Sequence, residues 1–194
     1  MEPDDVRKIL EPSHTALLIW DVQRMLVDGL FNRTDFLTAT RSLLRAARAR
    51  NVPVFFSKIT PLPERFESPV RKMFLKRMGG IRFSPGGLDL AIEPADRDTV
   101  IPKHTASMFV GTHFEHLLRN AGIGTIVLAG IATEIGIEST ARDASNRGFF
   151  PVIATDAVSS RSREAHERSL RNMEKICILQ TGAEIADIWG GSEA

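Results

Sequence analysis

Two charged residues at the ends of apolar runs are the first candidates for chemistry in this chain. Asp21 directly follows one such run, and Lys103 lies just beyond another. A carboxylate and an ammonium that meet in one pocket shift each other toward their charged forms, and they can exchange protons with a substrate once water is excluded. Each residue alone also has a structural explanation, because such an aspartate can cap the next segment and such a lysine can be a solvated turn residue. Their joint placement favours proton-transfer chemistry.

The elements that must position these residues follow from the alternation of short apolar runs with segments of helical period. This alternation is typical of parallel strands joined by crossover helices. It predicts an α/β fold, a three-layer α/β/α sandwich of Rossmann-like topology around a mainly parallel six-stranded sheet. The predicted strands are 16–20, 53–58, 99–101, 125–129, 151–155 and 175–179, and the predicted helices are 35–50, 114–121, 134–147, 163–173 and 183–189.

The carboxyl edge of this sheet is where a site is expected. In open α/β sheets, ligands bind beyond the carboxyl ends of the strands. Asp21 closes the first predicted strand, Lys103 follows the third, and the fourth opens into a turn that leads to Gly136. We therefore expect an acid, a base and the tight turn that starts a helix to lie together at the carboxyl edge of the sheet.

Composition limits the functional classes. The chain has 194 residues, 43% hydrophobic, with no Pro/Gly/Ser-rich linker, so we expect one domain over residues 1–194. A net charge of +1 and the absence of groove-reading motifs argue against nucleic-acid binding. The acidic start resembles no targeting leader, and no apolar run approaches the roughly 20 residues of a membrane span. These features predict a cytoplasmic protein without membrane association. The single cysteine, Cys177, is predicted to be a small apolar residue of the last strand.

The stretch 60–98 interrupts the alternation with five prolines, at 61, 63, 69, 85 and 94. So long an irregular insertion is more often a lid or a subunit contact than an idle loop. Its basic run at 71–77 has two interpretations, a solvated helix face or a surface that recognises an anionic, carboxylate-bearing ligand. Under the second interpretation Arg71 and Arg82 are the candidate anion-binding residues.

Metal and cofactor sites receive little support from the sequence. His113 and His116 are spaced to share a helix face, which is common on exposed helices, and His104 can line a pocket or satisfy a turn. The chain contains neither a phosphate-binding glycine loop nor a nucleophile elbow in the required context. We therefore expect no metal and no cofactor.

Three motifs in fixed order carry a resemblance to a known family. They read DVQ at 21–23, KHTASMF at 103–109, and GIATE at 130–134 followed by ESTARDA at 138–144. With them the chain resembles the isochorismatase-like hydrolase superfamily, also called the cysteine hydrolases, over essentially its whole length. The resemblance implies that Asp21 transfers protons, that Lys103 is its charged partner, and that Gly136 occupies the position of the catalytic cysteine.

The same resemblance implies further site residues around the fourth strand. It implies a cis peptide bond between Ile131 and Ala132, and oxyanion or substrate-binding groups at Ile131, Ala132, Thr133 and Gln23. Proteins of the superfamily commonly form dimers or larger assemblies, so a homo-oligomer is expected, with a small-molecule substrate as the other partner.

Gly136 is the departure that matters for mechanism. Thioester chemistry needs a thiolate at the helix start, and glycine has no side chain. Cys177 lies in a different predicted strand and does not replace it. Superfamily members that cleave isochorismate also lack this cysteine and rely on an acid that protonates a vinyl ether, whereas the sequence around 133–143 resembles the amidase branches more closely.

Two hypotheses of different class follow. The first is a hydrolase that acts on a small, carboxylate-bearing metabolite without a cysteine, with Asp21 as general acid or base and Lys103 as its partner. The alternative is a catalytically degenerate member that binds a small ligand without turnover. A third interpretation is a laboratory substitution at Gly136, which the neighbouring residues neither support nor oppose.

Overall fold

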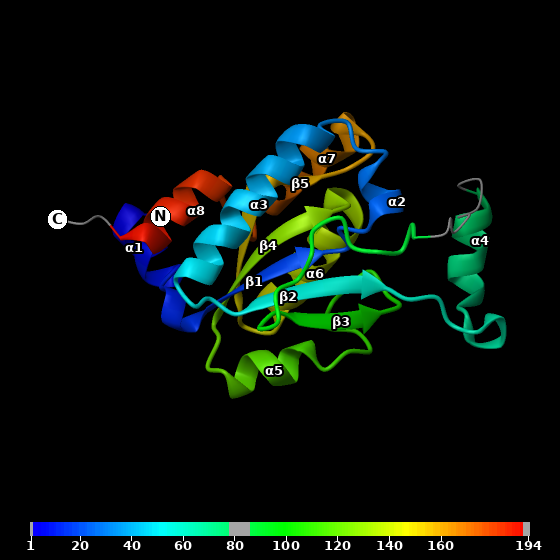
Figure 1. Cartoon of the computed structure of the whole chain (residues 1–194), viewed down its shortest axis with the longest axis horizontal. Coiled ribbons are helices and arrows are strands. Elements are labelled where there is room, and N and C mark those ends of the chain that lie inside the picture. The colour runs from blue at the N-terminus through cyan, green and yellow to red at the C-terminus, as the bar shows by residue number, and fades with distance from the viewer. Residues whose placement is uncertain (1, 78–85, 192–194) are drawn as a thin grey trace.

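Six parallel strands form one sheet in the order β3-β2-β1-β4-β5-β6 (Figure 1). The computed structural model describes residues 2–77 and 86–191, so Arg82 lies outside the described residues. The α/β prediction is confirmed, and every strand pair is parallel. The strands are β1 (Thr15–Trp20), β2 (Val54–Ile59), β3 (Thr99–Lys103), β4 (Thr125–Ile131), β5 (Phe150–Ser159) and β6 (Ile178–Gln180).

Helices cover both faces of this sheet (Figure 1). They are α1 (Pro3–Ile9), α2 (Arg24–Val27), α3 (Arg33–Ala49), α4 (Pro69–Arg77), α5 (Phe114–Asn120), α6 (Glu138–Asn146), α7 (Arg163–Met173) and α8 (Gly182–Gly190). Short 3-10 helices η1 (Pro12–His14) and η2 (Glu64–Phe66) and a π-helix η3 (Thr133–Ile137) complete the fold. No described helix is both long and apolar enough to cross a membrane.

The central strand β1 shows why the sequence folds this way. All six of its residues are buried, as expected for a strand covered on both faces. Its side chains alternate between two apolar clusters: Leu17 and Ile19 pack with α3 and α8, whereas Leu18 and Trp20 pack with α5, α6 and α7. Strand β1 therefore packs against both helical layers and places Asp21, the residue after Trp20, at the carboxyl edge of the sheet.

The strand order reverses between β1 and β4. The chain winds outward from β1 through β2 to β3, then returns to place β4 on the other side of β1. Such a reversal leaves a crevice beyond the carboxyl ends of the two central strands. Asp21 follows β1, and η3 follows β4, so both candidate segments lie at this reversal.

Two sequence predictions need correction. The predicted strand 175–179 begins only at Ile178, and Cys177 lies half-buried in the bend before it. The cause is the end of α7, where the Met173 carbonyl accepts hydrogen bonds from the amides of Ile176 and Cys177 at 2.9 and 2.8 Å. The predicted helix 134–147 begins as the π-helix η3 and becomes α6 only at Glu138.

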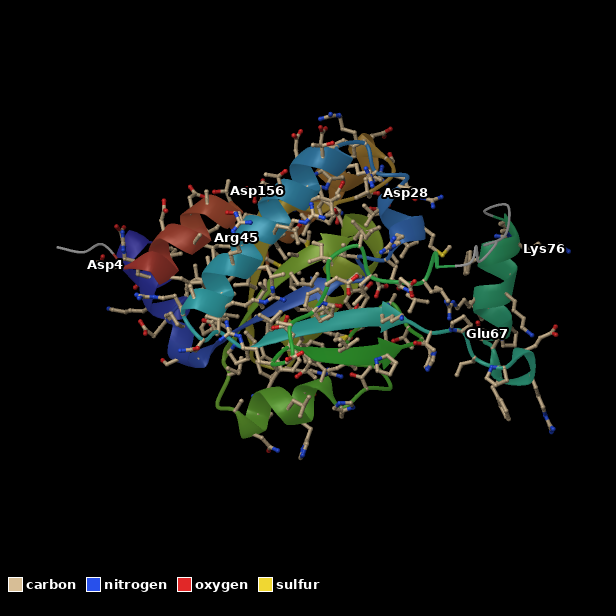
Figure 2. The ribbon with its side chains drawn as sticks, viewed as in Figure 1. Asp4, Asp28, Arg45, Glu67, Lys76 and Asp156 are labelled. Atoms are coloured by element: carbon tan, nitrogen blue, oxygen red, sulfur yellow. The ribbon has the colours of Figure 1, made fainter. Side chains whose placement is uncertain are left out.

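The insertion after β2 contains helix α4, which was not among the predicted helices, although a helix face was one of the two interpretations of the basic run at 71–77. α4 stands apart from the sheet at the end of an extended connection (Figure 1). Glu67 and Lys76 lie beyond the main body with it, as Figure 2 shows. Among the side chains that the structure describes on this arm, residues 64–77, the exposed large apolar ones are Phe66 (68% exposed), Val70 (60%), Met73 (44%) and Phe74 (50%).

Candidate active site at the reversal of strand order

Asp21 sits at the end of β1 in an unusual backbone conformation. Its φ of 47° lies in the left-handed region, which costs a non-glycine residue about 1–3 kcal/mol. The Ser57 hydroxyl of β2 stabilises this turn twice: it accepts from the Asp21 amide at 2.9 Å and donates to Asp21 Oδ1 at 2.5 Å. Strained, over-determined positions of this kind cluster at functional sites.

Lys103, at the end of β3, meets the other oxygen of the same carboxylate. Its Nζ lies 2.6 Å from Asp21 Oδ2, and the two side chains are only 3% and 4% exposed. The ammonium also donates to the Thr105 carbonyl at 3.1 Å. The predicted convergence of acid and base is therefore present, although the strand that carries Lys103 is separated from β1 by the whole of β2.

Burial sets the electrostatics of the pair. It raises the pKa of the Asp21 carboxyl above its ordinary value of 3.8, while the Lys103 ammonium and the Ser57 hydroxyl oppose this shift. Burial likewise lowers the pKa of Lys103 below 10.5, against the attraction of Asp21. Burial therefore brings the pKa values of the carboxyl and the ammonium closer together than they are in water. This suits a site that exchanges a proton with a substrate.

The turn after β4 brings Gly130 and Gly136 against β1. Gly130 has a φ of 121°, and a β-carbon there would lie 2.1 Å from the Trp20 carbonyl oxygen, so only glycine fits. The peptide bond between Ile131 and Ala132 is cis, as the family resemblance implies. At Gly136 a β-carbon would lie 1.8 Å from the indole Nε1 of Trp20.

The backbone of η3 uses part of its hydrogen-bonding capacity internally. The amides of Ile135, Gly136 and Ile137 all donate to the Ala132 carbonyl, at 3.2, 3.0 and 3.3 Å. The Gly136 amide is therefore engaged within the π-helix. Binding of a substrate oxygen by the backbone of Ile131 and Ala132 stays a prediction.

The side chains of Gln23 and Thr133 have structural partners. Gln23 is fully buried; it donates to the carbonyls of Ile59 and Leu88 and accepts from the Ile59 amide. It therefore fastens the end of β2 to the loop that precedes β3. Thr133 donates to the Ser159 carbonyl at 3.0 Å and lies 2.8 Å from His166 Nδ1. Neither side chain is free to bind a substrate without losing these bonds.

Arg71 connects the α4 arm to the loop after β3. Its Nη1 donates to the His104 carbonyl at 3.4 Å and to Glu67 Oε1 at 3.3 Å. The guanidinium lies close enough to the pair to lower the pKa of Asp21 and of Lys103, although burial is the larger influence on each. Of the two arginines considered for anion binding, Arg71 is thus near the site, and Arg82 lies outside the described residues.

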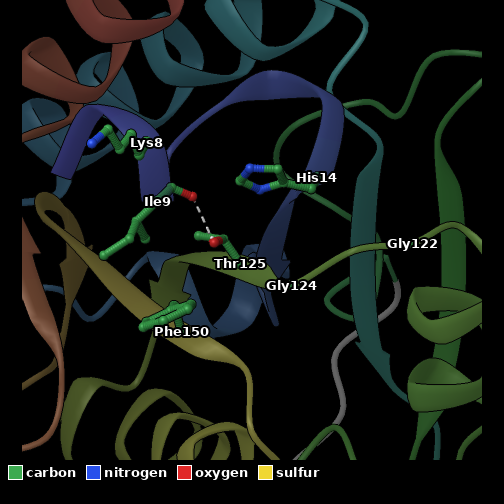
Figure 3. A pocket seen from close by; sticks show the side chains of 7 residues that line it. All are labelled: Lys8, Ile9, His14, Gly122, Gly124, Thr125 and Phe150. Carbon is green, nitrogen blue, oxygen red and sulfur yellow. Dashed lines mark hydrogen bonds between the residues drawn. The ribbon is translucent and has the colours of Figure 1, made fainter. Parts of the chain in front are cut away.

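A separate hollow lies at the opposite edge of the sheet. It has a volume of about 440 Å³. Its lining residues, drawn in Figure 3, come from α1, from the segments before β1 and β4, and from the first residues of β4 and β5, and Thr125 donates to the Ile9 carbonyl. Neither Asp21 nor Lys103 lines it. The remaining lining residues are Lys8, His14, Gly122, Gly124 and Phe150. Parallel sheets bind ligands at their carboxyl edge, so chemistry and position favour the Asp21–Lys103 pair over this hollow.

Sequence reasoning missed two contributors, Ser57 and Trp20. Ser57 was detectable as a polar residue inside the apolar run of β2. Trp20 immediately precedes Asp21, but as an aromatic residue of a buried strand it gave no sign of touching Lys103. Its ring centroid lies 4.0 Å from Lys103 Nζ, within cation–π range.

Comparison with known proteins identifies the family. Residues 15–188 match the model of the isochorismatase domain. The chain belongs to the isochorismatase family. Relatives with a named activity are hydrolases, among them an amidohydrolase and a nicotinamidase, which confirms the prediction of a hydrolase at the level of the family.

Three similar proteins illustrate the range of the family. The uncharacterized isochorismatase family protein YecD of Escherichia coli O157:H7 is 48% identical over 43% of this chain and 44% of its own length, so the matched segment is less than half of that relative. The ureidoacrylate amidohydrolase RutB of Pseudomonas syringae is 29% identical over 89% of this chain and 81% of its own. The solved structure of an isochorismatase family protein from Burkholderia thailandensis is 30% identical with a TM-score of 0.73, over 92% of this chain and 97% of that one.

Proposed function

We propose that this chain hydrolyses a small, carboxylate-bearing metabolite by a mechanism that uses no cysteine. The observation that carries the proposal is the 2.6 Å contact between Asp21 Oδ2 and Lys103 Nζ, buried at the reversal of strand order. Gly136, which stands at the nucleophile position by resemblance, supplies no nucleophile, so water is the attacking group. The proposed unit is a single domain over residues 1–194 that needs no cofactor.

Asp21 is the proposed general acid and base. The raised pKa of its carboxyl favours a protonated form that can donate to the substrate. Water then attacks the activated carbon, and the bond from this carbon to the leaving group breaks, with the proton donated by Asp21 kept by the products. The proton that the water loses returns to the Asp21 carboxylate, so one water is consumed and the carboxyl is restored. Lys103 holds the ionised carboxylate between the two steps, and backbone groups at Ile131 and Ala132 are proposed to hold a substrate oxygen.

We propose that a carboxylate of the substrate forms an ion pair with Arg71. This side chain is 21% exposed, and it bonds to the loop that follows Lys103, so its guanidinium lies near the pair, where a substrate carboxylate would compete with Glu67 for it. Planar guanidinium groups bind carboxylates through paired hydrogen bonds. RutB is named for an amidohydrolase acting on a ureidoacrylate, and this similarity supports a substrate of the same small, anionic class.

Substitution of Asp21 by asparagine tests the mechanism. Purified wild type, Asp21→Asn and the matched control Asp28→Asn, whose carboxylate is 69% exposed, are incubated with isochorismate and with a panel of small carboxylated ethers, amides and ureides. Product formation is followed by liquid chromatography and mass spectrometry. We expect the wild type and Asp28→Asn to turn over at least one compound, and Asp21→Asn to lose about 100-fold or more in kcat/KM. Equal turnover by Asp21→Asn would refute the assigned role.

A ligand-binding protein without turnover is the second candidate. It is supported by the burial of the Asp21–Lys103 pair, whose side chains are 3–4% exposed, because a substrate reaches them only after the covering segments move. If wild type and Asp21→Asn are equally inert on every compound while one of the compounds raises the Tm of the wild type, this candidate is correct.

We also propose that the chain assembles into a homo-oligomer through the α4 arm. The arm exposes large apolar side chains, Phe66, Val70, Met73 and Phe74 among them, on a short segment that stands apart from the main body (Figure 1). Exposed apolar clusters of this kind mark protein interfaces. A second copy of the chain is the proposed partner.

A further inference from the structure

Trp20 fills the space into which a side chain at position 136 would project. A β-carbon built on Gly136 would lie 1.8, 2.2 and 2.6 Å from indole atoms Nε1, Cε2 and Cζ2. Real β-carbons do not approach other heavy atoms closer than about 3 Å, so the indole edge passes through the position of the missing atom. Trp20 is 1% exposed and packs with Ile137 and Ala141, which leaves its ring little room to withdraw.

The backbone of Gly136 does not itself require glycine. Its φ lies outside the left-handed region that L-residues avoid, unlike that of Gly130, and it forms part of a regular turn of η3. The nearest obstacle to a larger residue is therefore the indole, which supplies the three heavy atoms closest to the built β-carbon. This distinguishes Gly136 from glycines that serve a turn, and it couples the identity of residue 136 to that of residue 20.

The same indole contacts the catalytic pair. The Lys103 ammonium lies 4.0 Å from its ring centroid, 2.6 Å from Asp21 Oδ2 and 3.1 Å from the Thr105 carbonyl. The aromatic face thus adds a third attractive contact to a buried cation that has two hydrogen-bond acceptors. Because Trp20 and Asp21 are adjacent in the chain, the indole and the carboxylate approach the ammonium from a single short segment.

We propose that Trp20 is a positioning residue that replaces the nucleophile's side chain in volume and holds the Lys103 ammonium against Asp21. The inference rests on the proposed function for its chemical meaning. It implies that Gly136 and Trp20 form a matched pair, so the side chain introduced by Gly136→Cys alone would clash with the indole. Room for a side chain at position 136 appears only when Trp20 is made smaller as well.

A double-mutant cycle on thermal stability tests the steric part without any substrate. The four proteins are wild type, Gly136→Ala, Trp20→Leu and the combination of both, with Gly190→Ala as the matched control, because a β-carbon at Gly190 would meet nothing within 4 Å. We expect Gly136→Ala to lower the Tm of the wild type by about 5 °C or more, and by less than about 2 °C in the Trp20→Leu background. Gly190→Ala leaves the Tm within about 2 °C.

Equal losses of Tm in the two backgrounds would overturn the proposal, because they would show that the backbone of Gly136 requires glycine. If Trp20→Leu does not fold, Trp20→Phe serves as the second background. Complete failure of Gly136→Ala to fold, with recovery in the Trp20→Leu or Trp20→Phe background, supports the proposal. Since these outcomes need no turnover, they are independent of the Asp21→Asn result on which the proposed function depends.

The contact with Lys103 is tested by NMR of protein labelled with ¹³C at the lysine ε-carbon. The chain has six lysines, and Lys103→Met identifies the resonance of interest. A methylene against an indole face is shifted upfield by the ring current. We expect the Lys103 ε-protons to lie upfield of the other lysines in the wild type and to return to the ordinary position in Trp20→Leu. An unshifted resonance in the wild type would refute the positioning role.

Discussion

Replacement of Lys103 by methionine is the most informative single perturbation of this molecule. Methionine keeps an unbranched, apolar side chain but removes the ammonium. The substitution leaves the Asp21 carboxylate without the partner at 2.6 Å, and it leaves the Thr105 carbonyl without its donor at 3.1 Å. Both side chains of the pair are only 3–4% exposed, so solvent does not replace the lost contacts.

The magnitude follows from this burial. Breaking a buried pair by removing one partner costs about 3–5 kcal/mol, compared with about 0–1 kcal/mol for an exposed pair. For a chain of this size each kcal/mol lowers the Tm by about 2–4 °C, so we expect a loss of roughly 6–20 °C at neutral pH. Lys8→Met is the matched control, because Lys8 is exposed on α1, and we expect its effect to stay within about 0.5 kcal/mol.

The sign of the pH dependence provides a second check on the same variant. Without the ammonium, the pKa of Asp21 is raised further, because the strongest opposing influence on it is gone. A folded-state pKa above the unfolded value contributes stability that is present at pH below 3.8 and is lost as the pH rises through the folded value. The deficit of Lys103→Met relative to wild type should therefore grow as the pH is raised from acid toward neutral.

Urea denaturation of wild type, Lys103→Met and Lys8→Met at several pH values measures both quantities. A deficit below about 1 kcal/mol at neutral pH would mean that the pair is solvated or worth little. A deficit that grows toward acid pH would contradict the assignment of Asp21 as the group left uncompensated. Either result would refute the electrostatic argument for the site.

Two further predictions concern regions outside the pair. Burial lowers the pKa of His166 below 6.5, so the stability that its neutral form provides is present above pH 6.5 and is lost as the pH falls. We therefore expect His166→Gln to show a smaller change of Tm than the wild type between about pH 5 and about pH 7. An equal change of Tm in the two proteins would contradict this. Phe74→Ser, which removes a half-exposed ring from the α4 arm, should reduce the mass measured by sedimentation velocity at least by half at equal concentration. Val110→Ser, at a residue 47% exposed outside the arm, should keep the wild-type mass, and a monomeric wild type would exclude the arm as an oligomer interface.

The parts of the fold that were predictable depend on local signals. Strand β1 is a continuous apolar run and its six residues are buried, so its limits were predicted within one residue. Helix α7 was predicted with its observed bounds; its buried residues, His166, Ser169 and Met173, recur at helical spacing, and Ser162 caps its start by accepting a hydrogen bond from the Ala165 amide. In contrast, β6 has only three residues, and its start is set by the hydrogen bonds that end α7 rather than by its own composition.

For the site itself, the sequence determined which groups reach the carboxyl edge. Asp21 and Lys103 each follow an apolar run, and the rule that parallel strands expose their carboxyl ends together was sufficient to predict their convergence. The sequence also determined that no thiol is present at position 136. These properties are local: they depend on residue type and on the end of a strand.

Only the tertiary structure decided what surrounds these groups. The contact between Trp20 and Gly136 joins residues that are 116 positions apart, and the bond between Ser57 and Asp21 joins two strands whose register no local pattern encodes. Volume and burial are properties of packing, because the same tryptophan fills a space only if β4 and η3 fold back against β1. The sequence alone was sufficient to predict the chemistry of Asp21. The reason that residue 136 must be small is the indole of Trp20 packed against it, and only the tertiary structure shows this contact.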